Sequence, residues 1–146
     1  GDKEIREKIN YGKLMHDIFE GIKTPADIRS SVRKLVLEGK LNAKESAAIE
    51  KRVEDLINSP TVADWFRPGN VILTEAGILL PSGNTKRPDR VIFRDGRTII
   101  IDFKFGVESD HYISQVNQYR QLMADMGYSS IEAYIWYVDK NLIVSA

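Results

Sequence analysis

Two aspartates and a lysine are spaced so that a strand and its hairpin partner could bring them together. Asp102 and Lys104 lie two residues apart in the apolar segment Thr98–Phe105, which we expect to be a strand. Alternate side chains of a strand share a face, so these two would stand about 6–7 Å apart on one side of a sheet. Asp89 precedes the neighbouring predicted strand, and a hairpin turn at Asp95-Gly96 would return it to the same end.

These residue types suit the binding of a hard divalent cation beside a phosphate ester. Mg²⁺ prefers oxygen ligands, often one or two carboxylates together with water and a substrate phosphate. A neighbouring lysine can orient or deprotonate the attacking water, or offset the charge that develops at phosphorus.

A second interpretation of the same residues involves no chemistry. An Asp-x-Lys pair on a strand is commonly a solvated face with a weak surface ion pair, and Pro88-Asp89 is a common turn dipeptide. Placement favours the first interpretation, because Asp102 and Lys104 interrupt a strongly apolar strand. Charge in a core is costly unless it is paired or bound to a metal.

The chain changes character at Pro68-Gly69, so we expect a mainly helical part, 1–68, and a β-rich core, 69–146, within a single domain. Apolar residues recur at helical spacing from Tyr11 to about Gly21. A second helix is predicted to start at Thr24, with Asp27 at its third position, and to stop at Gly39. A third begins at Asn42, and Asp64-Trp65-Phe66 is predicted to be a short turn.

The second part alternates in the manner of strands with one intervening helix. The helix is predicted from Ser109 to Met126, ended by Gly127. The predicted strands are Val71–Glu75, Gly77–Leu80, Arg90–Phe93, Thr98–Phe105, Ile131–Val138 and Asn141–Val144. Turns are expected at Ser82-Gly83-Asn84 and Asp139-Lys140. The order of elements predicts an α/β fold with a mixed central sheet.

Composition narrows the possible chemistry. The 146 residues include no cysteine, which excludes disulfides, thiolate nucleophiles and cysteine-ligated zinc or iron–sulfur sites. The 21 Lys and Arg residues balance 21 Asp and Glu, so any attraction to nucleic acid must be local or come from metals and partners. We expect a basic edge around the predicted hairpin, formed by Lys86, Arg87, Arg90, Arg94 and Arg97.

Four motifs resemble those of the RecB-like branch of the PD-(D/E)xK nuclease superfamily, and they occur in the order that this branch has. The segments Arg87–Val91 and Ile100–Gly106 are similar to the two parts of the PD-(D/E)xK signature. Gly12–His16 is similar to the branch's G-x-x-x-H motif, and Gln115–Tyr119 to its Q-x-x-x-Y motif. The resemblance implies a restriction-endonuclease-like core with a mixed central sheet flanked by helices and preceded by a helical segment.

The resemblance also implies a set of metal ligands. Asp89 and Asp102 would be the main ligands of Mg²⁺ or Mn²⁺, with the Phe103 backbone carbonyl completing the shell. His16 would add an imidazole nitrogen, although a lone histidine on a helix is more often a surface or core-edge residue. Glu75 would be an additional acid, or alternatively a surface charge at a strand end.

The resemblance implies that Lys104 is the catalytic lysine. It also implies that Gln115 and Tyr119 lie beside this lysine, at the edge of the same site. They lie four residues apart and therefore on one helical face, where they could bond the lysine, a water or a phosphate. Alternatively Tyr119 belongs to the core and Gln115 is incidental. The second histidine, His111, matches no motif and is expected at the surface.

Together these features predict a metal-dependent deoxyribonuclease, the exonuclease domain of a helicase–nuclease that acts in DNA repair and recombination. The chain does not begin with Met and contains no ATP-binding G-x-x-x-x-G-K-[ST] loop, so we expect an ATP-dependent helicase domain or subunit as partner. The setting would be the bacterial cytoplasm, at the nucleoid, with no membrane association. The alternatives are an inactive DNA- or partner-binding module of this fold, and a restriction or junction-resolving endonuclease.

Overall fold

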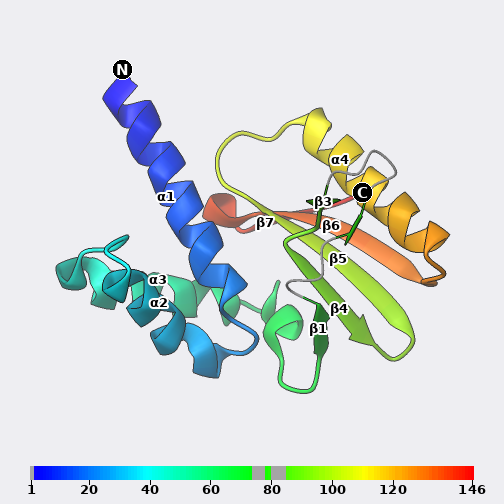
Figure 1. Ribbon diagram of the computed structural model, residues 1–146, viewed down its shortest axis with the longest axis horizontal. Coiled ribbons are helices and arrows are strands. Elements are labelled where there is room, and N and C mark those ends of the chain that lie inside the picture. Colours follow the sequence, from blue (N-terminus) through cyan, green and yellow to red (C-terminus); the bar gives the residue numbers. More distant parts are fainter. Residues whose placement is uncertain (1, 74–77, 80–84) are drawn as a thin grey trace. The chain divides into compact units, whose positions relative to one another are not determined.

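The computed structural model describes residues 2–73, 78–79 and 85–146, which form two compact units, Gly1–Gly69 and Asn70–Ala146 (Figure 1). The boundary lies beside Pro68-Gly69, where the sequence pattern changes from helical to β. In the described ranges no helix has both the length and the apolar character needed to cross a membrane.

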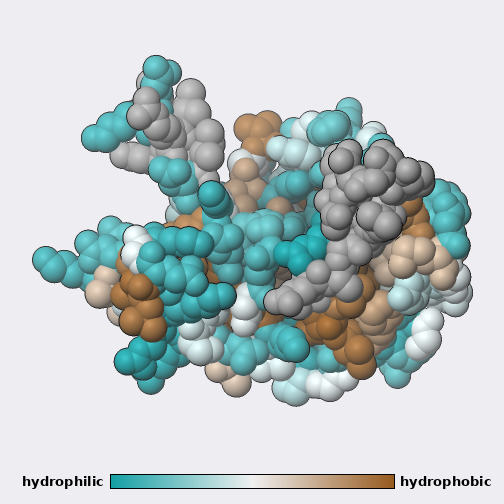
Figure 2. All heavy atoms as spheres, in the orientation of Figure 1, coloured by the Kyte–Doolittle hydropathy of each residue, from teal (hydrophilic) through white to brown (hydrophobic). Residues whose placement is uncertain are grey.

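The first unit contains three α-helices and three short 3₁₀ turns among its described residues. The α-helices are α1 (Asp2–Glu20), α2 (Ile28–Leu37) and α3 (Ser46–Ile57), and the 3₁₀ turns are η1 (Pro25–Asp27), η2 (Ala43–Glu45) and η3 (Ala63–Phe66). The helix α1 begins at Asp2, well before the start at Tyr11 that the apolar spacing predicts, and its added residues are mostly polar. In the view of Figure 2 this unit exposes mainly hydrophilic residues.

Helix boundaries in this unit follow local signals. The carboxylate of Asp27 accepts a hydrogen bond of 3.2 Å from the Thr24 backbone N–H, as the predicted helix start requires. The side chain of Asn42 accepts a hydrogen bond from the Lys44 backbone N–H and caps η2. Gly39 lies at φ 74°, a left-handed conformation that ends α2 at little steric cost.

The helices α1 and α2 approach closely at Gly21. The Ser31 hydroxyl of α2 is buried and donates a hydrogen bond of 2.6 Å to the Ile18 backbone carbonyl. A Cβ atom at Gly21 would lie 2.5 Å from the Ser31 Oγ, so any larger residue would force the Ser31 side chain or the backbone to move. The rings of Phe19 and Phe66 pack at 6.3 Å between centroids within the same unit.

The second unit is built on a five-stranded mixed sheet in the order β1-β4-β5-β6-β7. Its strands are β1 (Val71–Leu73), β4 (Arg90–Arg94), β5 (Arg97–Lys104), β6 (Ile131–Tyr137) and β7 (Leu142–Ser145). Only the β5–β6 pair is parallel, and the connection between these strands contains α4 (Asp110–Asp125). The α/β class and the mixed sheet predicted from the sequence are therefore confirmed.

Short segments complete the second unit. The strands β2 (Ile78–Leu79) and β3 (Thr85–Lys86) pair as a separate antiparallel sheet, and the sequence did not predict β3. The 3₁₀ turn η4 (Val138–Lys140) joins β6 to β7 where a tight turn was predicted. Glu75 and the predicted Ser82-Gly83-Asn84 turn lie outside the described residues.

The helix α4 covers one face of this sheet (Figure 1). Val116, Tyr119 and Met123 of α4 pack in one cluster with Ile100 of β5 and Ile135 of β6. Side chains alternate along a strand, so Asp102 and Lys104 share the face of Ile100 and face α4. Ile99, Ile101 and Phe103 are buried on the opposite face, as the alternation predicted.

Candidate functional site

The carboxylates of Asp89 and Asp102 meet where the β4–β5 ladder ends. Arg90 pairs with Ile101 in this antiparallel ladder, so Asp89 lies opposite Asp102, one step beyond. The Asp89 backbone N–H donates a hydrogen bond of 3.1 Å to Asp102 Oδ1. In return, the Phe103 backbone N–H donates one of 2.8 Å to Asp89 Oδ2. The predicted convergence of the two aspartates is confirmed, and main-chain donors fix it.

The hairpin turn sets this alignment. Asp95 and Gly96 both have positive φ, 52° and 76°, the conformation of a two-residue turn that suits the twist of the flanking strands. Arg94 therefore pairs with Arg97, and each further step away from the turn keeps the two strands in register.

Burial makes the negative charge of Asp102 electrostatically costly. Asp102 is 3% exposed, and its burial, followed by the negative charge of Asp89, raises its pKa from 3.8 to about 7. The ammonium group of Lys104 opposes this rise only in part. A divalent cation held between the carboxylates would offset their negative charge beyond what Lys104 provides, so the residues present fit a hard metal ion.

Lys104 ends β5 beside the aspartates. Its Nζ lies 3.5 Å from Asp102 Oδ2 and donates a hydrogen bond of 3.3 Å to Gln115 Oε1. The same Nζ lies 4.7 Å from the centroid of the Tyr112 ring, within cation–π range. The lysine side chain is 23% exposed, so it lies between the buried Asp102 and the solvent.

The helix α4 places Gln115 beside Lys104, as the sequence predicted, whereas the predicted bonding role of Tyr119 stays a prediction. Tyr119 belongs to the core of the second unit. Burial, and next the charges of Asp102 and Asp89, raise the pKa of its hydroxyl to about 12. The hydroxyl therefore stays protonated at neutral pH and remains a hydrogen-bond donor near the two carboxylates. Tyr119 is thus both a core residue and part of the electrostatic surroundings of the site.

Sequence reasoning missed Tyr112. It precedes Gln115 by three residues and Tyr119 by seven, so the three share one face of α4. The helical spacing of Tyr112 relative to Gln115 could have revealed its place near the site, but Tyr112 belongs to none of the four motifs. The α4 N-terminus is fixed by Ser109, whose side chain accepts a hydrogen bond from the His111 backbone N–H. His111 is exposed, as expected.

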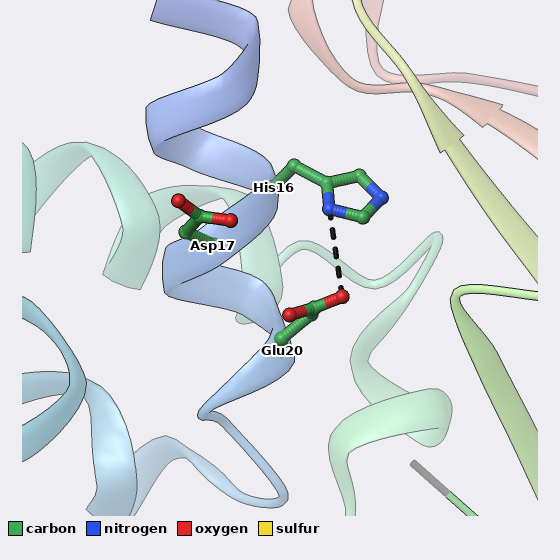
Figure 3. Close-up of side chains that lie close together, drawn as sticks. All are labelled: His16, Asp17 and Glu20. Atoms are coloured by element: carbon green, nitrogen blue, oxygen red, sulfur yellow. Dashed lines mark ion pairs between the residues drawn. The ribbon is translucent and has the colours of Figure 1, made fainter. Parts of the chain in front are cut away.

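His16 belongs to the first unit, whereas the residues gathered on β5 and α4 belong to the second. It projects from α1 on the same side as Glu20, one turn further along (Figure 3). Its Nδ1 is 3.7 Å from Glu20 Oε1, and its potential ligand atoms group with those of Glu20 and Asp17. Acidic groups of this kind are common on helix surfaces, so this cluster does not by itself define a metal site. The expected role of His16 as a ligand stays a prediction.

The expected basic edge is smaller than the sequence suggested. Arg90 is 1% exposed, because it faces the buried side of the sheet away from α4. The guanidinium of Arg97 forms an ion pair with Glu132 on β6. The contribution of Arg90 to a surface that meets phosphates was therefore predicted wrongly, and that of Arg97 is shared with a carboxylate.

Neither the known protein families nor the curated proteins include a match to this chain. The interpretation of the site therefore depends on its geometry and on the chemistry of its residues.

Proposed function

We propose that this chain is a metal-dependent deoxyribonuclease of the PD-(D/E)xK kind, the exonuclease part of a helicase–nuclease that acts in DNA repair and recombination. The observation that carries the proposal is the contact of the buried Asp102 with the half-buried Asp89, with Lys104 beside them. Two carboxylates at the end of a strand pair supply hard oxygen ligands, and the lysine supplies a mobile positive charge next to them.

The chemistry divides between the metal and the protein. Asp89 and Asp102 would hold Mg²⁺ or Mn²⁺, which when bound lowers the pKa of water and stabilises charge on a phosphate. Lys104 would lie beside the scissile phosphate, where its ammonium offsets the negative charge that develops during hydrolysis. Gln115 limits the positions that this ammonium can take, because its Oε1 accepts a hydrogen bond from Nζ.

The arrangement favours an enzyme over an inert binding module. A module that only grips DNA needs surface cations, whereas this site buries a carboxylate that would repel phosphate without a metal. The buried charge of Asp102 destabilises the metal-free fold, and a bound cation would offset that cost. DNA and an ATP-dependent helicase are the partners that we propose on the basis of the sequence resemblance.

The test is cleavage of end-labelled linear single- and double-stranded DNA by the purified chain. We expect products with Mg²⁺ or Mn²⁺ and none with EDTA. The variants Asp89→Ala, Asp102→Ala and Lys104→Ala should each lose activity by at least about 10³-fold while retaining their far-UV circular dichroism.

The matched control is Asp139→Asn, which alters an exposed aspartate in η4. It should cleave like the wild type. Cleavage that persists in EDTA, or an Asp102→Ala variant as active as the wild type, would overturn the proposal.

A further inference from the structure

One aromatic side chain contacts the lysine without belonging to any of the sequence motifs. Tyr112 lies in the first turn of α4, and Lys104 Nζ lies over its ring at 4.7 Å from the centroid. We propose that Tyr112 is a positioning residue, whose ring holds the Lys104 ammonium at the edge of the Asp89–Asp102 pair. This inference rests on the proposed nuclease function and adds a residue to its site.

The sheet explains why Tyr112 meets the lysine. Lys104 of β5 and Tyr137 of β6 are register partners on adjacent parallel strands, so both project toward α4. The Tyr137 ring packs against the Tyr112 ring at 6.4 Å between centroids. The Ser109 backbone N–H donates a hydrogen bond of 3.2 Å to the Tyr137 hydroxyl. Tyr137 therefore fixes the first turn of α4, and with it the ring beneath the ammonium.

The polar contacts of Lys104 leave it room to move. Its distances of 3.5 Å to Asp102 and 3.3 Å to Gln115 are long for hydrogen bonds of an ammonium group. A lysine also has a flexible four-carbon stem. The electron-rich face of an aromatic ring attracts a cation without demanding one fixed hydrogen-bond direction. The Tyr112 ring thus restricts the ammonium on a side where neither oxygen holds it.

Two substitutions separate the ring from the rest of the side chain. Tyr112→Phe keeps the aromatic face and removes the hydroxyl, whereas Tyr112→Leu keeps apolar bulk and removes the face. Under single-turnover conditions with Mg²⁺ we expect Tyr112→Phe to cleave within about 2-fold of the wild type. We expect Tyr112→Leu to be slower by about 10-fold, since the loss of a cation–π contact leaves a catalytic group misplaced.

Further measurements distinguish positioning from a general loss of structure. The Mn²⁺ affinity of Tyr112→Leu should equal that of the wild type, because Tyr112 contacts the lysine rather than the carboxylates. Tyr128→Leu removes an aromatic ring that stacks on Phe93, beyond the C-terminal end of α4, and is the matched control for apolar packing. It should leave the cleavage rate unchanged.

The contact itself can be measured without any nuclease activity. In the metal-free chain the Lys104 Hε protons should resonate upfield of other lysines because of the ring current of Tyr112. The signal is assigned by its loss in Lys104→Ala. It should persist in Tyr112→Phe and move to the position of the other lysines in Tyr112→Leu.

The outcomes separate the two proposals. If the wild-type chain cleaves no DNA with either metal, the nuclease function fails, whatever the lysine spectrum shows. If the wild type cleaves and Tyr112→Leu cleaves at the same rate, the positioning role of Tyr112 is overturned and the nuclease function stands. A Lys104 signal that is not shifted in the wild type would also overturn the role of Tyr112.

Discussion

At the scale of single residues, the ionisation of Asp102 links stability to pH and would link it to the proposed metal. Its pKa in the fold, about 7, lies above the ordinary value of 3.8. The folded chain therefore binds more protons than the unfolded chain between these two values, so this group lowers stability as pH rises from about 4 to about 7. Above pH 7 the full cost of the buried charge remains until a cation binds.

Replacement of this carboxylate should separate stability from function. Asp102→Asn keeps an oxygen that can accept the hydrogen bond from the Asp89 N–H and removes the buried charge. In urea unfolding without metal at pH 8, we expect it to be more stable than the wild type by on the order of 1–3 kcal/mol. At pH 4 the two proteins should be nearly equal.

Asp139→Asn, at an exposed position, should change stability by less than about 0.5 kcal/mol at either pH. Added Mg²⁺ should stabilise the wild type at pH 8 and leave Asp102→Asn unchanged. An Asp102→Asn variant that is less stable than the wild type at pH 8 would show that the carboxylate is satisfied without a cation.

His16 allows a second test at the scale of residues. If it ligates a metal, His16→Ala should weaken Mn²⁺ binding by about 10-fold or more. Glu20→Gln is the informative companion, because Glu20 is the neighbour of His16 on α1. Weaker binding in His16→Ala alone would assign the imidazole, whereas weaker binding in both would indicate a local site on α1. Equal affinities in all three proteins would leave His16 as a surface residue paired with Glu20.

At the scale of elements, the α1–α2 crossing depends on the absence of a side chain at Gly21. A methyl group there would overlap the Ser31 Oγ, which already donates to the Ile18 carbonyl. We expect Gly21→Ala to lower the free energy of unfolding by about 1–3 kcal/mol in urea titrations. The cost should be smaller in a Ser31→Ala background, where the overlapping oxygen is gone. Equal costs in the two backgrounds would place the strain elsewhere.

Elements also show what could be predicted from the sequence and what could not. The meeting of Asp89 with Asp102 was predictable, because a two-residue turn at Asp95-Gly96 leaves one register for the strands that flank it. The burial of Arg90 was not, because periodicity along one strand does not tell whether its second face is covered. The contact of Tyr112 with the site could not be predicted from the sequence, because it depends on Lys104 and Tyr137, which lie on different strands.

At the scale of the whole molecule, charge limits how the chain can hold DNA. Equal numbers of acidic and basic residues leave no net field to attract a polyanion. Affinity from phosphate contacts grows with their number, and the buried Arg90 and the paired Arg97 reduce that number further. An attached or partner helicase would then supply both DNA-binding affinity and processivity.

We accordingly expect the Asp102→Ala form, in which the proposed activity is removed, to bind DNA with a dissociation constant above about 1 µM at physiological salt. Fluorescence anisotropy of labelled single- and double-stranded oligonucleotides measures this directly, and affinity should fall further as salt rises. Binding in the nanomolar range typical of specific complexes would contradict dependence on a helicase and favour a self-sufficient endonuclease.

The hairpin turn has a consequence for how this protein can evolve. Asp95 and Gly96 are exposed, and loops of this kind ordinarily vary in both composition and length. Here a change in turn length that shifted β4 by one position against β5 would turn Asp89 toward the opposite face of the sheet, unless a longer loop absorbed the change. Substitutions that accept positive φ leave the two aspartates together, whereas a shift of register separates them. Selection on the site would therefore act on the register that this turn sets more strongly than on the residues of the turn.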